Sequence, residues 1–393
     1  MTDVRNETRE QMTNQETPVR PFAGAARAEQ YVEIDQTTER PIRFHLPEPE
    51  PEPTPPEPAE TPVAELAPAI DDLGQLAPAI DDLGQLATVD APAVVTSGIR
   101  GLVAKTGIKV APSRAEADRL ATARALRRDE DTIRQATWTR AVSILVANRK
   151  GGVGKTPTAV IVGGILASIR GGSVAVMEVS DDPGTLTFRT EGTPSHGIGE
   201  LVRDSHLIRS AGQLAGYTAP QTSFASVIGT VGPRPSLTAD DVVNVARVVD
   251  EYYTIRVMDS GNQPSSSAFE GATATADAIV IPVLNSADVI LEAVALIDQL
   301  RASGPRGAWL ADRAIIIRLT DGRPEQPALM DRLTQLLEAQ HVAGIYSVPC
   351  DAHIAERGPI TVAKLAPVTR TAFVAATAGV VRTLQSHHLS NQQ

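Results

Sequence analysis

Six apolar runs rich in β-branched residues alternate with helix-like segments from residue 141 onward, and this alternation constrains the fold most. The runs are AVSILVA, SVAVMEV, TIRVMDS, DAIVIPV, RAIIIRL and VAGIYSV. Unbroken apolar runs of this length predict strands that are buried on both faces. The segments between them, such as TADDVVNVARVVDEYY and ADVILEAVALIDQL, predict helices. We therefore expect residues 140–393 to form an α/β domain with a mainly parallel sheet covered by helices on both faces.

The first 95 residues have a different character. They hold 19 acidic and 6 basic side chains, and LPEPEPEPTPPEPAE alternates proline with glutamate. Such a composition favours extended, self-repelling chain, so we predict that residues 1–95 are disordered. The decapeptide LAPAIDDLGQ occurs twice in tandem, over residues 66–85. It is either a duplication in a tolerant linker or a docking motif for a protein partner, presented twice.

A basic segment separates this acidic region from the α/β domain. Residues 96–150 hold 12 basic and 5 acidic side chains. Ser113 and Glu116 have the spacing of a capping box before a stretch rich in helix formers, so we predict a basic helical arm over residues 96–139. The arm could bind the DNA backbone without reading sequence, or fold back on the acidic region of its own chain. An anionic membrane surface is a poorer match, because the arm has little apolar bulk.

Cysteine usage and hydropathy limit where the protein works. Cys350 is the single cysteine, which rules out an internal disulfide and fits a reducing compartment. No apolar run reaches the roughly 18 residues that a transmembrane helix needs. The polar, acidic N-terminus does not have the character of a secretory signal. We therefore expect a cytoplasmic protein.

The stretch NRKGGVGKTPTA, residues 148–159, predicts a phosphate-binding loop between a strand and a helix. Three glycines, Gly151, Gly152 and Gly154, allow backbone N–H groups to converge on phosphate oxygens around Val153. Lys155 is expected to reach the β- and γ-phosphates, and Thr156 to offer its hydroxyl to Mg²⁺. Pro157 falls in the first turn of the helix, where a missing N–H costs little.

Lys150 directly precedes the first of these glycines, a departure from the strict phosphate-loop pattern, and here the chain resembles the ParA/MinD family of deviant Walker-A ATPases. The resemblance covers roughly residues 140–385 and rests on four motifs: KGGVGKTPT, EVSDDPGTLTFR, VMDSGNQPSS and VPCDAHIAERGP. It implies a Rossmann-like P-loop NTPase fold, ATP and Mg²⁺ as cofactors, and a homodimer formed around ATP. It also implies that Lys150 crosses the dimer interface to the partner's nucleotide, by the logic of an arginine finger.

The resemblance further implies which acids serve the reaction. Asp259, at the end of TIRVMD, matches the Walker-B aspartate that holds Mg²⁺. The acid that orients the attacking water has two alignments. Matching the Asp-Pro pair selects Asp182, our preferred residue, whereas matching strand register places Glu178 first and Ser180 in the catalytic position. Asp181 is a further rival.

The loop SVPCDAHIAERGP follows the last predicted strand, and in the family such a loop cradles adenine, so the resemblance implies contacts from Pro349 and Asp351. The proline-rich front and basic arm also resemble actinobacterial relatives found on plasmids or beside type VII secretion systems. We therefore expect an ATPase that acts as a dimeric switch in plasmid or chromosome partition or in DNA-associated positioning. The alternatives are a regulatory ATPase of a secretion or conjugation apparatus and a nucleotide-binding scaffold with little hydrolysis.

Overall fold

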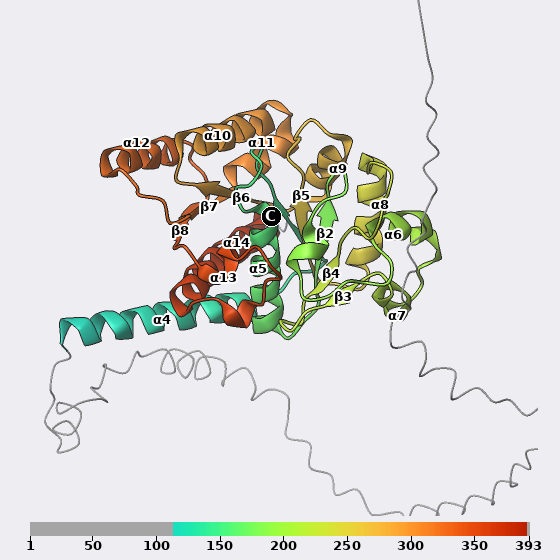
Figure 1. Ribbon diagram of the computed structural model, residues 1–393, viewed down its shortest axis with the longest axis horizontal. Coiled ribbons are helices and arrows are strands. Elements are labelled where there is room, and N and C mark those ends of the chain that lie inside the picture. The colour runs from blue at the N-terminus through green and yellow to red at the C-terminus, as the bar shows by residue number, and fades with distance from the viewer. Residues whose placement is uncertain (1–112, 391–393) are drawn as a thin grey trace, which may run out of the picture. The chain divides into compact units, whose positions relative to one another are not determined.

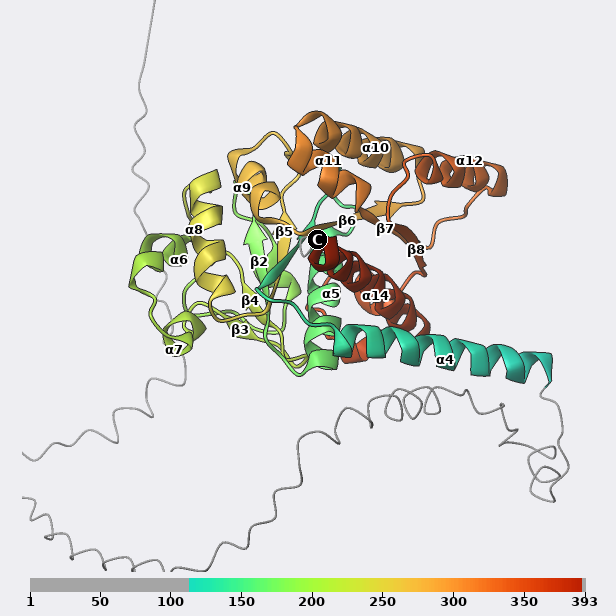
Figure 2. The same cartoon turned by 180° about the vertical axis from the view of Figure 1, so that it is seen from behind.

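The structure is a computed structural model that describes residues 113–390, with side chains described as far as residue 386. The acidic region 1–95, its tandem decapeptide and the first part of the basic arm lie outside the described residues. Figures 1 and 2 show the described part from two opposite sides, with helices on both faces of one sheet.

The sheet has eight strands in the order β3-β4-β2-β5-β1-β6-β7-β8. Their bounds are β1 Val142–Val146, β2 Val174–Val179, β3 Ala219–Pro220, β4 Ser226–Ile228, β5 Ile255–Ser260, β6 Ala278–Leu284, β7 Ile315–Leu319 and β8 Gly344–Val348. Neighbouring strands run parallel, except that β3 runs antiparallel to β4. The six runs predicted as strands are confirmed, and so is the predicted fold class. The short strands β3 and β4 were not predicted, because two and three residues carry too little periodicity.

Each face of the sheet has its own apolar core. Along β1, Val142, Ile144 and Val146 belong to one core, while Leu145 belongs to the other. The first core is covered by α4 (Arg114–Gln135), α5 (Lys155–Arg170) and α14 (Pro367–Ser390). The second is covered by α6 (Ile198–Asp204), α7 (Ala211–Ala215), α8 (Ala239–Asp250), α9 (Ser267–Thr275), α10 (Ala287–Ala302), α11 (Pro305–Asp312) and α12 (Pro327–Glu338). The remaining elements are the short helix α13 (Ala352–Ala355) and the 3₁₀ helices η3 (Leu186–Arg189), η4 (Ser205–Leu207) and η5 (Val362–Lys364).

Helix α4 is the part of the basic arm that the structure describes. Ser113 caps it as the sequence predicts, its hydroxyl accepting from the Glu116 N–H at 3.3 Å. At the other end Arg170 of α5 donates to the carbonyls of Ile133 and Ala136, at 2.7 and 2.8 Å. Ile133 and Ala136 are both buried in the first core. The end of α4 is thus anchored to the α/β domain.

Two ion pairs also join α4 to α14. Glu130 pairs with Arg370 at 3.4 Å, and Asp129 pairs with Arg382 at 3.2 Å. Figures 1 and 2 both show the N-terminal half of α4 extending past the helices that it packs against. None of the helices described over residues 113–390 combines the length and hydropathy that a bilayer crossing needs.

Candidate functional site

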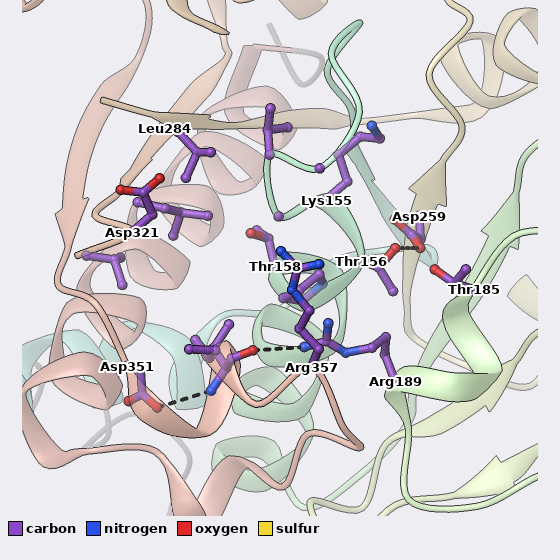
Figure 3. Close-up of a pocket in the computed structure, with 18 of the residues that line it drawn as sticks. Lys155, Thr156, Thr158, Thr185, Arg189, Asp259, Leu284, Asp321, Asp351 and Arg357 are labelled. Atoms are coloured by element: carbon purple, nitrogen blue, oxygen red, sulfur yellow. Dashed lines mark hydrogen bonds between the residues drawn. The ribbon is translucent and has the colours of Figure 1, made fainter. Parts of the chain in front are cut away.

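A pocket of about 650 Å³ opens at the carboxyl ends of the parallel strands, where α/β sheets usually bind ligands. Its lining consists of residues 152–158, 259–262, 319–321 and 348–351, with Glu178, Ser180, Gly184, Thr185, Arg189, Leu284, Arg323, Ile354, Ala355, Arg357 and Phe373. Figure 3 shows the labelled lining residues around this space. The predicted phosphate-binding motif, the predicted Walker-B aspartate Asp259 and the predicted adenine loop therefore meet in one place.

The predicted phosphate-binding loop connects β1 to α5. Gly152 and Gly154 have φ angles of 76° and 92°, which favour glycine. A Cβ added to Gly154 would lie 2.6 Å from the end of the Leu319 side chain, which would have to move to make room for it. The helix begins at Lys155, and the Thr158 N–H donates to the Gly154 carbonyl at 2.9 Å. Pro157 therefore lies in the first turn, as the sequence predicts, and does not interrupt the helix.

Lys155 brings a buried cation to this loop. Only 7% of the residue is exposed, and Nζ donates to the Lys150 carbonyl at 3.1 Å and to Oδ1 of Asn262. Burial lowers the pKa of Lys155 to about 8, and nearby Asp259 partly opposes this shift. Because its two hydrogen-bond partners are neutral oxygens, the ammonium charge remains available to an anion.

Thr156 and Asp259 place two oxygen-bearing side chains, both possible metal ligands, beside Lys155. The Thr156 hydroxyl donates to Oδ2 of Asp259 at 2.7 Å, as Figure 3 shows. The other carboxylate oxygen, Oδ1, is buried and has no hydrogen-bond partner among the described residues. Burial raises the pKa of Asp259 to about 7, and the negative charge of Glu178 adds to this shift. A divalent cation would satisfy the unpartnered oxygen, and oxygen ligands of this kind suit Mg²⁺.

Glu178 lies beside Asp259 in the sheet, where the two are register partners on β2 and β5. Its carboxylate forms a buried ion pair with Arg234 at 3.0 Å, with the two side chains 1% and 2% exposed. The Arg234 guanidinium also donates to the backbone carbonyls of Ser180, Asp181 and Asp182, at 2.8, 2.7 and 2.9 Å. Arg234 therefore fixes the segment that follows β2.

This arrangement bears on the choice between the two catalytic alignments. Asp182 is exposed and, like Asp181, is not among the pocket-lining residues, whereas Ser180 and Glu178 are. The register of β2 against β5 thus puts Ser180 at the pocket, and the preferred candidate Asp182 lies outside it. The physical reason is that Arg234 holds the carbonyls of this segment inward while the Asp182 side chain faces solvent.

Lys150 and Gly151 also lie outside the pocket lining. The Lys150 side chain is 47% exposed, and Nζ lies 3.4 Å from the carboxylate of Asp288 on α10. Arg149 pairs with Glu292 one turn further along the same helix, at 3.1 Å. The Lys150 side chain therefore points away from the pocket of its own chain.

The predicted adenine loop reaches the pocket through Pro349 and Asp351. Asp351 caps α13, because its carboxylate accepts from the N–H groups of His353 and Ile354, at 2.9 and 3.4 Å. The carboxylate also accepts from the Ala366 N–H at 2.9 Å. Its carboxylate is thus engaged by backbone donors, and the loop also offers apolar surface to the pocket through Pro349, Ile354 and Ala355.

Four pocket or near-pocket residues were missed by sequence reasoning: Arg189, Arg234, Asn262 and Arg357. Three of them lie within motifs that the sequence singles out, GTLTFR, DSGN and AERGP. No periodicity marked them, because only the tertiary fold brings these segments together.

Comparison with known proteins supports the family assignment. The family model of the CobQ/CobB/MinD/ParA nucleotide binding domain matches residues 144–358. No curated protein matches the chain significantly.

Several solved structures are similar to the chain at low sequence identity. A ParA family ATPase from Chlorobium tepidum is 14% identical, with 64% of this chain and 98% of that chain covered and a TM-score of 0.46. The cell division ATPase MinD from Pyrococcus furiosus is 13% identical, with 62% and 99% covered and a TM-score of 0.48. The cell division protein MinD from Aquifex aeolicus is 14% identical, with 64% and 98% covered and a TM-score of 0.43.

Proposed function

The chain belongs to the CobQ/CobB/MinD/ParA family of nucleotide-binding domains, and from this premise we propose that it is an ATP-dependent switch. In this proposal the protein binds ATP with Mg²⁺, forms a homodimer around the nucleotide and acts in plasmid or chromosome partition or another DNA-associated positioning process. Hydrolysis of ATP returns the dimer to monomers.

The observation that carries the proposal is a group of three side chains at one end of the pocket that suits a phosphate and a metal ion. Lys155 supplies a cation held by neutral oxygens, and Asp259 supplies a buried oxygen without a partner in the described chain. Thr156 holds the other oxygen of Asp259. Thr156 and Asp259 would hold Mg²⁺, which, when bound, neutralises phosphoryl charge.

Exposure of Lys150 supports the proposed dimer. Its pair with Asp288 joins two partly exposed side chains, and such pairs contribute little to stability. The pair can therefore be exchanged for a phosphate of a second copy at small cost. Leu291 lies on the same helix as Asp288 and is 57% exposed, which offers apolar surface to that second copy.

Charge on α4 supports the DNA-binding part of the proposal. Two of its acids, Asp129 and Glu130, are paired with arginines of α14. Arg119, Arg127 and Arg128 are exposed. Replacing these three arginines with glutamine should weaken binding to nonspecific duplex DNA and make the salt dependence less steep. Unchanged affinity and unchanged slope would remove α4 from the DNA-binding surface.

Equilibrium binding of ATP, measured by calorimetry with and without Mg²⁺, tests the nucleotide site. We expect Lys155→Ala to abolish binding in both conditions, because the buried cation beside the phosphate-binding loop is lost. We expect Thr156→Ala to lose the enhancement by Mg²⁺ while retaining metal-free binding. Thr185→Ala, also at the pocket, serves as the matched control and should bind as the wild type does. Absence of ATP binding by the wild type would contradict the proposal.

A second candidate, a nucleotide-binding scaffold with little hydrolysis, is favoured by the exposed position of Asp182. A serine is a poor activator of water, so Ser180 at the pocket would leave hydrolysis slow. Steady-state ATP turnover of the wild type and Asp182→Ala, with and without nonspecific DNA, separates the two candidates. Turnover that DNA raises and that the variant loses supports the switch. ATP binding with negligible turnover in every sample supports the scaffold.

A further inference from the structure

Two arginines enter the pocket from segments far apart in the sequence. Arg189 is the last residue of η3, after β2, and Arg357 follows α13, after β8. Both line the pocket, and Figure 3 shows them reaching into it between Thr158 and the segment that holds Asp351. The two labelled side chains lie side by side in Figure 3. In agreement with this placement, burial lowers the pKa of Arg189 and the positive charge of Arg357 lowers it further.

These arginines lack the acidic partners that other pocket charges have. Arg189 donates to the Ile354 carbonyl at 3.3 Å, while its Nε is buried and has no partner in the described chain. Neither arginine forms an ion pair within residues 113–386. By contrast Arg323, another arginine of the pocket, pairs with Asp321 at 3.0 Å. Two neighbouring guanidinium groups without an acid repel each other and favour a bound anion.

The acids of the pocket do not supply that anion. Glu178 is paired with Arg234, and Asp351 accepts from backbone N–H groups. Asp259 accepts a hydrogen bond from the Thr156 hydroxyl, at the other end of the pocket. An anion for the arginine pair must therefore come from the ligand.

Pro157 indicates which part of the ligand needs these arginines. A helix N-terminus binds phosphate through its free N–H groups, and Pro157 has none. The next N–H, that of Thr158, is committed to the Gly154 carbonyl. The first turn of α5 therefore offers fewer backbone donors beyond Thr156, on the side of the pocket that leads from the phosphate loop towards Pro349. A nucleotide with its outer phosphates at the phosphate loop and its base near Pro349 would have the phosphate nearest its ribose at that point.

We propose that Arg189 and Arg357 together bind the α-phosphate of the nucleotide and replace the backbone donor that Pro157 removes. This inference rests on the proposed function, because it takes a nucleotide as the ligand. Guanidinium groups suit this role, since each can give two parallel hydrogen bonds to one phosphate.

Competition binding against a fluorescent ATP analogue tests the assignment with four competitors: ATP, ADP, AMP and adenosine. Arg189→Gln and Arg357→Gln are compared with Arg323→Gln, a matched control whose arginine is already paired with an acid. Thermal unfolding of each ligand-free variant checks that the fold is retained, and Arg357→Gln is the safer variant because Arg357 is exposed. We expect each of the two substitutions to weaken ATP, ADP and AMP by the same factor of about ten, the cost of one charge-assisted hydrogen bond. Adenosine and the Arg323→Gln control should be unaffected.

Each other pattern overturns the assignment in a distinguishable way. A loss confined to ATP, or to ATP and ADP, would place the arginines at the γ- or β-phosphate. An equal loss for adenosine would place them at the sugar or base. Unchanged affinities in both variants, with wild-type binding intact, would overturn this inference and leave the proposed function standing. Failure of the wild type to bind any of the phosphorylated competitors would overturn the proposed function itself.

Discussion

At the scale of single residues, we propose that Asp259 couples Mg²⁺ binding to pH. Its carboxyl is buried, which raises its pKa to about 7, and only the ionised form is a good ligand for Mg²⁺. We expect the Mg²⁺-dependent gain in ATP affinity to fall about tenfold for each pH unit below 7, because each unit reduces the ionised fraction about tenfold. Calorimetric titrations between pH 5.5 and 8 measure this gain. A gain that stays constant over this range would show that Asp259 is not the ligand that titrates.

Protonation of the same carboxyl weakens metal binding in this proposal, but it stabilises the folded, ligand-free protein. Its pKa in the folded chain lies above the ordinary value of 3.8, so the folded state binds this proton more tightly than the unfolded state does. The stability that it contributes is fully present below about pH 4 and is lost as the pH rises through 7. Asp259→Asn should remove this component, which chemical denaturation of the ligand-free wild type and variant at several pH values would detect. Identical pH dependence in the two proteins would contradict the buried, raised carboxyl.

Two glycines of the phosphate loop offer a matched pair of substitutions. Both have positive φ, but a Cβ on Gly152 meets nothing within 4 Å, whereas one on Gly154 meets Leu319 at 2.6 Å. Gly152→Ala should therefore cost only the left-handed strain of about 1–2 kcal/mol. Gly154→Ala should cost more, because Leu319 must move as well. Urea unfolding measures both, and equal losses would show that the loop relaxes freely around Gly154.

At the scale of elements, the segment after β2 depends on one buried arginine. Arg234 pairs with Glu178 and holds three successive carbonyls from Ser180 onward. Removing one partner of a buried ion pair leaves an uncompensated charge, so we expect Arg234→Gln to lose about 3–5 kcal/mol of unfolding free energy. Glu178→Gln together with Arg234→Gln should lose less than the sum of the single variants. Additive losses in a double-mutant cycle would show that the pair is not coupled.

The helices and strands show which parts of the fold and of the candidate site could be predicted from the sequence. The six longer strands and the start of α5 were predictable, because apolar runs and the glycine-rich motif are local signals. The position of Asp182 was not, since the Asp-Pro pair and the strand register gave different alignments. The register of β2 is seen only in the structure, where Glu178 lies opposite Asp259 on β5 and Arg234 holds the segment that follows β2. Arg189 and Arg357 could not be found either, because only tertiary structure places η3 beside the segment after α13.

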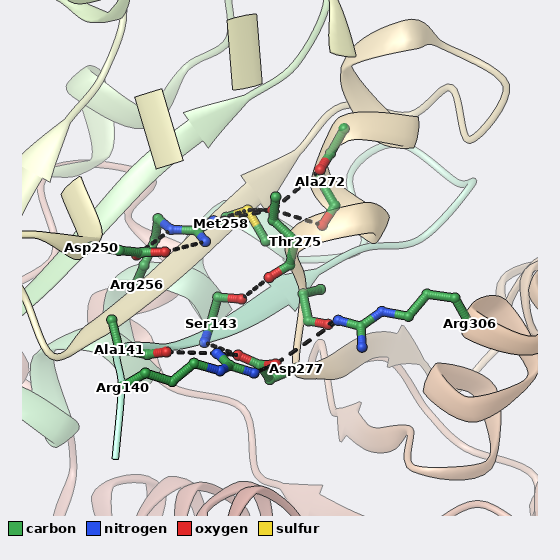
Figure 4. Close-up of polar contacts among 12 residues, drawn as sticks. Arg140, Ala141, Ser143, Asp250, Arg256, Met258, Ala272, Thr275, Asp277 and Arg306 are labelled. Carbon is green, nitrogen blue, oxygen red and sulfur yellow. Dashed lines mark hydrogen bonds and ion pairs between the residues drawn. The ribbon is translucent and has the colours of Figure 1, made fainter. Parts of the chain in front are cut away.

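Polar contacts at the opposite end of the sheet have a structural role and were also beyond sequence reasoning. Figure 4 shows Asp277 accepting from the Arg140 guanidinium, at 2.7 and 2.9 Å, and from the Ser143 N–H at 2.9 Å. Burial alone would raise the pKa of Asp277. The hydrogen bond and the positive charge of Arg140 outweigh this effect and hold the pKa below its usual range. This network fixes the start of β1, the strand that leads into the predicted phosphate-binding loop.

At the scale of the whole molecule, we propose that two copies share the nucleotide through Lys150. The residue lies outside its own pocket and is half exposed, in a weak pair with Asp288 on α10. The neighbouring Arg149 has a similar exposure and a similar acidic partner, Glu292, but does not occupy the signature position. It therefore provides a matched control for the loss of one positive charge on this face.

The most direct test is the solution mass of the full chain by light scattering, with and without saturating Mg²⁺ and a non-hydrolysable ATP analogue. We predict the 41.5 kDa monomer without nucleotide and twice that mass with it. Lys150→Ala should bind the analogue and remain a monomer, while Arg149→Ala should dimerise as the wild type does. A wild type that binds the analogue yet stays at the monomer mass, or a Lys150→Ala variant that dimerises normally, would contradict the shared-nucleotide dimer.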